Sequence, residues 1–313
     1  MNHISETQNQ EINIRRLSAQ SELYSDAKFF FALQTIFSIP IAVVFALVLV
    51  FFNDTQLSLI GIKKTYLQLI AAIHSLLFLT FDLTILSPHI SGLKERAAKI
   101  QETFDCEVYS LPWNDILCET MPDNEEIYMY AKKHQESSNL ENFKNWYSVS
   151  SEKIPLSVAR LLCQRSNCCW DMFLRNKLLN LLLGTSISLF FALLVIALIM
   201  EMSLANTIAN LVSPLSPVIA FTIRQRLDHK KSMNRWIKIK NTLDATLQKI
   251  TTSTPSDSSL ILISRSVQDG IYLVRKDSPL VFDWINRWFH NEQQESMDYS
   301  IEQMSQKYIQ SHL

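Results

Sequence analysis

The sequence has very little glycine, with 4 residues among 313. They stand at Gly61, Gly92, Gly184 and Gly270, too far apart to form either a G-x-G-x-x-G or a G-x-x-x-x-G-K-[ST] loop. Two common phosphate-binding loops are therefore excluded. Because sheet-rich folds with many tight turns need glycine at positions of positive φ, the shortage also favours long helices. We expect a mainly α-helical chain.

Cysteine is also scarce, and none of the five cysteines forms a C-x-x-C pair. An odd number cannot all pair within one chain, so we expect reduced cysteines packed in helices rather than a disulfide scaffold. No metal site is predicted, since zinc needs about four converging ligands. A cleavable signal peptide is not expected either, because the chain is polar up to Lys28 and shows no A-x-A-like site.

Apolar residues, 48% of the chain, are concentrated in a few long runs, and the charged 19% lie mostly between them. A helix needs about 20 apolar residues to cross the hydrocarbon core of a bilayer, and four runs approach or reach that length. We therefore predict a four-transmembrane-helix protein built from two helical hairpins. The first hairpin has spans at 29–52 and 66–86, and the second has spans at 178–200 and 204–223.

Positive charge is distributed unevenly around these spans, which predicts their orientation. Lys and Arg flank the outer ends of both hairpins, whereas the tips carry only Lys63 and Lys64. Both termini and the segment between the hairpins should then be cytoplasmic. The predicted cytoplasmic parts are an amphipathic helix at 1–28, a region at 87–177 and a helical region at 224–313.

The fourth span carries polar residues at spacings of four and three, namely Asn206, Asn210 and Ser213. Such spacing places them along one helical face, and polar groups facing lipid are costly. The face should therefore meet protein or water. Two interpretations follow: hydrogen bonds between helices or subunits, at roughly 0.6 to 2 kcal/mol each, or the wall of a pore.

Between the hairpins, apolar and polar residues alternate from Phe104 to Trp113, and Pro112 stands near the end of this stretch. Alternation with period two is typical of a strand. We therefore predict that residues 104–113 can form a small β element.

Two polar patterns in the cytoplasmic regions could hold a ligand. Arginine can bind phosphate through its planar, fork-shaped guanidinium group. Amides can hydrogen-bond to bases, and aromatic rings can stack on them. The same residues could instead form ion pairs between helices, with Asp171 bonding to Arg175 and Asp269 to Arg265. The candidate ligand-binding residues are Arg160, Gln164, Arg165, Arg265, Gln268, Asp269, Tyr272, Arg275 and Trp284.

Three ordered motifs give the chain a resemblance to a known family. They are YSDAK at 24–28, ARLLCQRSN at 159–167 with Trp170, Asp171, Leu174 and Arg175, and QDGIY at 268–272 with Arg275. With the two-plus-two layout of spans, this order resembles the SMODS-associated four-transmembrane effectors of bacterial cyclic-oligonucleotide-based antiphage signalling (CBASS).

The resemblance implies an effector of the bacterial inner membrane that is activated by a cyclic oligonucleotide or cyclic dinucleotide. It implies a homo-oligomer that permeabilises this membrane and so causes cell death or growth arrest. Membrane lipids are its expected partners, with no catalytic residues, no cofactor and no DNA or RNA polymer as partner. The alternatives are a membrane-embedded hydrolase using His74, Asp82 or His229, a small transporter, and a constitutive membrane oligomer gated by a protein partner.

Overall fold

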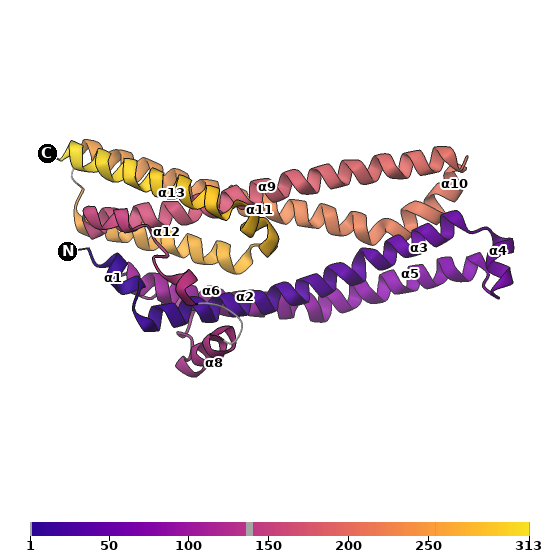
Figure 1. Cartoon of the computed structure of the whole chain (residues 1–313), viewed down its shortest axis with the longest axis horizontal. Coiled ribbons are helices and arrows are strands. Elements are labelled where there is room, and N and C mark those ends of the chain that lie inside the picture. The colour runs from indigo at the N-terminus through magenta and orange to yellow at the C-terminus, as the bar shows by residue number, and fades with distance from the viewer. Residues whose placement is uncertain (1, 136–139, 254, 313) are drawn as a thin grey trace. The chain divides into compact units, whose positions relative to one another are not determined.

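The computed structural model describes residues 2–135, 140–253 and 255–312, and the regular structure of these residues is helical throughout (Figure 1). The mainly α-helical prediction is confirmed. In the first half of the chain the helices are α1 (Ile4–Gln8), α2 (Glu11–Ser38), α3 (Pro40–Phe51), α4 (Asp54–Leu59), α5 (Lys64–Phe81), α6 (Ser87–Val108), α7 (Asp115–Cys118) and α8 (Asn124–Gln135). In the second half they are α9 (Leu156–Ile199), α10 (Leu204–Thr207), α11 (Ser213–Thr252), α12 (Asp257–Asp277) and α13 (Asp283–Ser311).

Four helical stretches are long and apolar enough to cross a membrane, which confirms the prediction of four spans. Each stretch is much longer than the span it contains. The four stretches are Glu11–Phe51, Lys64–Val108, Leu156–Ile199 and Leu204–Thr252.

The chain divides into two compact units. The span unit comprises residues 28–90 and 178–230 and contains the four apolar runs. The bundle unit comprises residues 1–27, 91–177 and 231–313. Helices α2, α6, α9 and α11 each contribute residues to both units.

The bundle unit has one main apolar core, to which distant parts of the sequence contribute. Leu17 of α2, Phe104 of α6 and Leu161 of α9 are all fully buried in it. Helix α12 begins at the cap residue Ser256, whose side chain accepts a hydrogen bond from the Ser259 amide, and it buries one face. That face carries both apolar residues and the polar side chains described below.

The small β element expected at 104–113 is wrong. Residues 104–108 form the last turn of α6, and Tyr109–Trp113 is an irregular connection. The alternation of Phe104, Cys106 and Val108 resembles a strand only in isolation, since Ile100, Phe104 and Val108 repeat with the spacing of a helix and are all buried.

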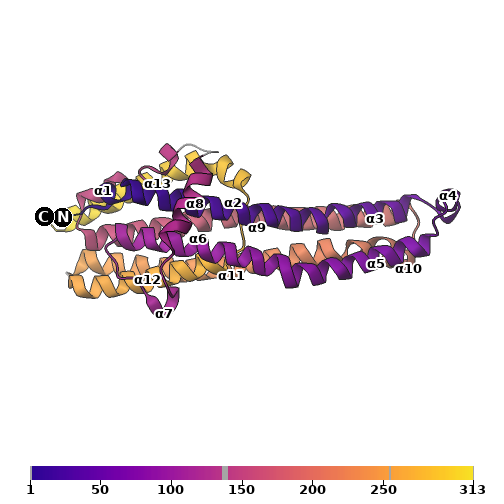
Figure 2. The same cartoon turned by 90° about the horizontal axis from the view of Figure 1, so that it is seen from below.

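In the span unit, Pro40 takes the first position of α3, where the missing N–H of proline costs no helical hydrogen bond. Figure 2 shows α3 continuing in the direction of α2. Single π-helical turns interrupt two other spans, at Asp82–Leu86 before α6 and at Ile208–Val212 before α11. Such turns are often found at functional sites. Each of them here contains a buried polar residue, Asp82 and Asn210 respectively.

Candidate functional site

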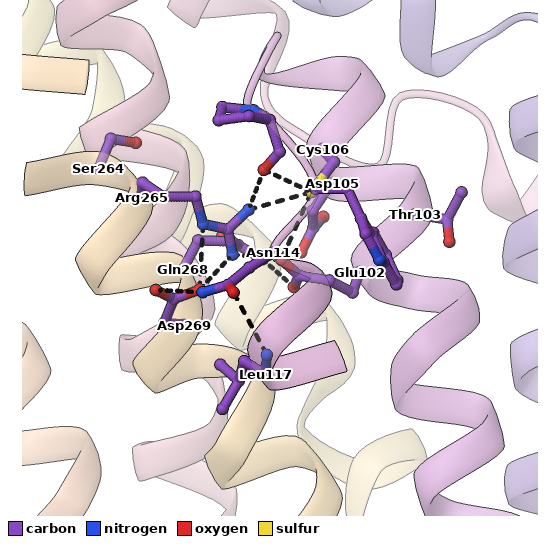
Figure 3. A network of polar contacts seen from close by, with 12 residues as sticks. Glu102, Thr103, Asp105, Cys106, Asn114, Leu117, Ser264, Arg265, Gln268 and Asp269 are labelled. Atoms are coloured by element: carbon purple, nitrogen blue, oxygen red, sulfur yellow. Dashed lines mark hydrogen bonds and ion pairs between the residues drawn. The ribbon is translucent and has the colours of Figure 1, made fainter. Parts of the chain in front are cut away.

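The most polar part of the bundle interior is built around two carboxylates of α6, Glu102 and Asp105. Both side chains are completely buried. They stand three residues apart and therefore lie on one helical face, which meets α12 (Figure 3). A buried charge is tolerated only with partners. The chemistry of this site therefore depends on the bonding partners of Glu102 and Asp105.

Arg265 of α12 is the principal partner of Glu102. Its guanidinium donates to Glu102 Oε1 at 2.6 Å, and it forms an ion pair with Asp269 at 2.8 Å (Figure 3). It also donates to the carbonyl oxygen of Pro112 at 2.9 Å. Burial raises the pKa of Glu102, against the lowering effect of Arg265. The Arg265 fork is thus occupied by protein acceptors.

Gln268, one helical turn from Ser264, connects the two carboxylates to α9. Its Nε2 donates to Glu102 Oε2 and to Asp105 Oδ2, both at 2.8 Å. Its Oε1 accepts a 3.0 Å hydrogen bond from Gln164, whose side chain also donates to the Ser264 carbonyl and accepts from the Ser264 hydroxyl. α6, α9 and α12 are therefore joined by one buried polar network.

Asp105 forms the other end of this network. Arg275 Nη1 and the Tyr147 hydroxyl each donate to it at 2.5 Å. Asn167 in turn donates to the Tyr147 hydroxyl oxygen at 3.1 Å. Burial and the nearby Asp105 hold the pKa of Tyr147 well above its ordinary value, so this hydroxyl remains a donor.

Arg160 differs from the other candidate arginines. It lies on α9 one turn before Gln164 and is only 5% exposed, yet its Nε and Nη1 are buried without any hydrogen-bond acceptor among the described residues. Desolvation lowers its pKa, while the charge of Asp257 at the start of α12 acts in the opposite direction. By contrast, Arg165 donates to Asp244 at 2.6 Å and to Ser300 at 3.4 Å.

The structure thus brings together Gln164, Arg265, Gln268, Asp269 and Arg275, five of the nine predicted ligand-binding residues. The ring of Tyr272, a sixth, packs in the interior with Ala98 and Cys118. Arg165 belongs to the ion pair with Asp244, and Trp284 contacts Phe282 and Trp288. Both ion pairs considered from the sequence, Asp171–Arg175 and Asp269–Arg265, are present.

The two carboxylates of α6 were missed by sequence reasoning. Glu102 and Asp105 lie on the helix whose end was interpreted as a strand, which hid their common face. Asn114, which donates to both oxygens of Asp269 at 3.1 Å, and Tyr147 come from irregular segments. Only the spacing of the two acids, with buried apolar neighbours at helical intervals, could have indicated them.

The polar residues of the span unit form two smaller groups. Asp82, 5% exposed, accepts hydrogen bonds from Gln34 and Ser87, and Arg224 lies 3.4 Å from its Oδ2. Asn210 accepts a 2.9 Å hydrogen bond from Gln68. The other two residues of the predicted polar face, Asn206 and Ser213, are exposed.

The residues considered for hydrolysis lie in separate surroundings. His74 lies beside the rings of Phe45 and Phe78, at centroid distances of 5.9 and 6.3 Å, and His229 is buried. Asp82 belongs to the hydrogen-bonded group just described. Within the part of the chain that the structure describes, no group of three His, Cys, Asp or Glu side chains could hold a metal ion.

Comparison with known proteins gives one consistent result. A probable CBASS effector molecule of Bacillus cereus strain VD146 is 27% identical over 284 residues, which cover 90% of each chain. No solved structure is significantly similar to this protein. The family profile of the SMODS-associating 4TM effector domain matches residues 2–304. This four-span membrane protein therefore belongs to the SMODS-associating 4TM effector family.

Proposed function

We propose that this protein is a non-enzymatic antiphage defence effector that binds a cyclic nucleotide in its bundle unit and then permeabilises the bacterial inner membrane. Family membership and the relative described as a probable CBASS effector support the defence role. The activating ligand would be a cyclic oligonucleotide or cyclic dinucleotide made during infection.

The observation that carries this proposal is the Arg160 guanidinium, whose buried Nε and Nη1 have no hydrogen-bond acceptor among the described residues. A buried cation whose donors lack acceptors destabilises the folded state. An anionic acceptor is needed to offset the free energy lost by desolvating the guanidinium. A phosphodiester supplies two oxygens and a negative charge in the geometry that a guanidinium fork fits. The neighbouring Gln164 amide belongs to the buried network, so a phosphate at Arg160 would bind beside it.

Arg265 is proposed as a second position for a phosphate of the ligand. Arg265 is held by Glu102, and burial raises the pKa of that carboxyl. Proton uptake by Glu102 would weaken its ion pair with Arg265. The Arg265 guanidinium would then be free to bind a second phosphate. Ligand binding would then rearrange the hydrogen bonds between α6 and α12, which is a change in helix packing within the bundle unit.

The output is proposed to involve several copies of the chain. Asn206 and Ser213 are exposed on an apolar span, and polar side chains at that depth are stable against protein or water rather than lipid. A homo-oligomer in which these residues line a passage would satisfy them. To move such an assembly from about 1:99 open to 99:1 open takes roughly 5.5 kcal/mol of differential binding, which several bound ligands can supply together.

The orientation proposed for this function places both termini and the bundle unit in the cytoplasm, where the nucleotide is made. Reporter fusions at residue 313 and at the tip near Gly61 should give cytoplasmic and periplasmic signals respectively. An external C-terminus would contradict the proposal.

The function itself is tested with the full chain in vesicles loaded with a self-quenched dye. A panel of cyclic dinucleotides and trinucleotides is added from outside, with the matching linear nucleotides as controls. We expect dye release with at least one cyclic compound and none with its linear counterpart. Turnover of nucleotide or lipid without release would favour a membrane-embedded hydrolase instead.

A further inference from the structure

The first turns of α13 carry a cluster of aromatic side chains, most of them turned outward. Trp288 is 75% exposed and Trp284 is 37% exposed, and their rings meet edge to face with centroids 5.0 Å apart. Phe282, just before the helix, stacks on Trp284 with a centroid distance of 6.5 Å. Arg287 is exposed between the two tryptophans. We call Phe282, Trp284, Arg287 and Trp288 the aromatic cluster.

The position of this cluster follows from the contacts between α13 and α9. The two helices run antiparallel, so that falling residue numbers in α13 pair with rising numbers in α9. Lys177 lies over the Phe289 ring at 4.6 Å, Gln293 donates to the Trp170 carbonyl at 2.7 Å, Ser166 lies 3.8 Å from Met297, and Arg165 lies 3.4 Å from Ser300.

This register places Trp288 level with Lys177, the last residue of the bundle unit on α9. Trp284 lies one turn farther along α13, a displacement of about 6 Å in the direction in which α9 continues as the apolar run 178–200. Since that run crosses the membrane, Lys177 stands at the boundary between hydrocarbon and water. The aromatic cluster is therefore at the depth of the lipid headgroups.

The structure assigns the aromatic cluster to the bilayer: we propose that Trp284 and Trp288 insert into the boundary between headgroups and acyl chains and hold α13 against the membrane. Tryptophan is enriched at this depth because its ring is apolar while its N–H remains hydrated. Lys177 and Arg287 add cationic groups that can reach the phosphates.

The charge along α13 fits this placement. Two exposed residues after the cluster, Glu292 and Glu295, are acidic, whereas the cluster itself contains Arg287. Asp283 beside Trp284 is exposed and negative, so the attraction should come mainly from the indole rings. We therefore expect the contact in zwitterionic phosphatidylcholine as well as in anionic membranes.

The test uses the full chain reconstituted without nucleotide in phosphatidylcholine vesicles whose acyl chains carry bromine near the carbonyl end. Bromine quenches tryptophan only on contact. Replacing both residues, Trp284→Phe and Trp288→Phe, should lower the quenched part of the emission at least about twofold, because these rings supply the lipid contact. Bromine near the terminal methyl should quench the wild-type protein less.

The matched control is Trp146→Phe, since Trp146 is also 37% exposed in the bundle unit. This change should leave quenching unaltered. The single variant Trp288→Phe guards against misfolding, because three-quarters of that side chain is exposed, and it should lower quenching in part. If neither the single nor the double variant changes quenching, the cluster faces water or a second copy of the chain, and the proposal is overturned.

Discussion

The two units of this protein differ in the partners of their buried charged groups. In the bundle unit, Glu102 and Asp105 are fully buried and each bonds to an arginine that is itself largely buried. In the span unit, buried Asp82 bonds to an amide and a hydroxyl, and its cationic neighbour Arg224 is about half exposed. The bundle network thus depends on complete pairing, whereas the Asp82 group retains access to a more polar environment.

The two units also differ in how far their apolar residues are buried within the chain. The bundle unit packs its apolar residues into one main core. In the most apolar eighteen-residue stretch of α9, none of the residues is buried within the chain. In the span unit, Ala42, Ala46, Leu215 and Val218 form a small buried cluster. The bundle unit is therefore stabilised mainly by its own interior, and the span unit needs lipid or other subunits.

The largest expected effect comes from breaking the bundle network. Asp105→Asn leaves the Arg275 guanidinium buried without a charged partner and should lower the unfolding free energy by about 3 to 5 kcal/mol. Chemical unfolding of the detergent-solubilised chain measures this loss. Glu119→Ala removes the exposed partner of Lys99 and should leave the unfolding free energy unchanged. Equal effects of the two changes would contradict the importance of complete pairing.

A smaller effect is expected from the polar residues of the fourth span. Asn210→Leu leaves Gln68 without its acceptor and should cost roughly 0.6 to 2 kcal/mol, seen as a lower melting temperature. Asn206→Leu changes an exposed residue and should not destabilise the chain. If Asn206 lines the passage, its apolar replacement should instead block nucleotide-triggered dye release through dewetting while crosslinked assemblies persist. Undiminished release from assembled Asn206→Leu protein would exclude Asn206 from the passage.

The substitution that matches Asp105→Asn in the span unit is Asp82→Asn. Asparagine keeps one acceptor oxygen, and the half-exposed Arg224 can remain hydrated. The expected loss is about 0.6 kcal/mol per weakened hydrogen bond, well below that of Asp105→Asn. Unfolding of both variants in the same detergent tests this ranking, and a larger loss for Asp82→Asn would reverse the comparison.

The smallest effect is a pH dependence. Burial raises the pKa of Glu102, so the folded chain keeps this proton at pH values above about 4.3, where the unfolded carboxyl has lost it. The folded state then binds more protons than the unfolded state, and stability falls as pH rises from the unfolded pKa to the folded pKa. Glu102→Gln should remove this part of the slope, measured as the difference between the two proteins over a pH series. An identical slope in both would show that Glu102 does not titrate differently in the folded chain.

The sequence predicted the four spans because bilayer thickness and the hydrophobic effect impose a length that is visible in composition. It also predicted helices next to the spans at 1–28 and 224–313, and in the structure Leu17 and Leu243 of these helices are buried. It could not predict the π-helical turn at Ile208–Val212. That extra residue per turn breaks the i, i+4 alignment, and in the structure Asn210 is buried while Asn206 is exposed.

For the site, the sequence singled out residues of α9 and α12 but not Glu102 and Asp105, to which Gln268 bonds in the structure. Gln164 and Gln268 were selected for their chemistry, and the structure joins them at 3.0 Å. The hydrogen bond from Gln268 to Glu102 joins residues that are 166 positions apart in the chain, and local periodicity carries no signal for such tertiary packing. The local sequence also gives no signal for Arg160, because tertiary packing decides whether its buried donors meet acceptors.

The most direct test of the account is Arg160→Met, measured for stability and for nucleotide-triggered dye release on one preparation. Methionine has a similar length and no charge. Because Nε and Nη1 of Arg160 lack acceptors within the described part of the chain, removing this buried cation should keep or raise the melting temperature. If Arg160 holds a phosphate of the cyclic nucleotide, dye release should be lost from this stable, membrane-inserted variant. A wild-type response to the nucleotide, or a destabilised chain, would contradict the assignment of Arg160 as the phosphate-binding residue.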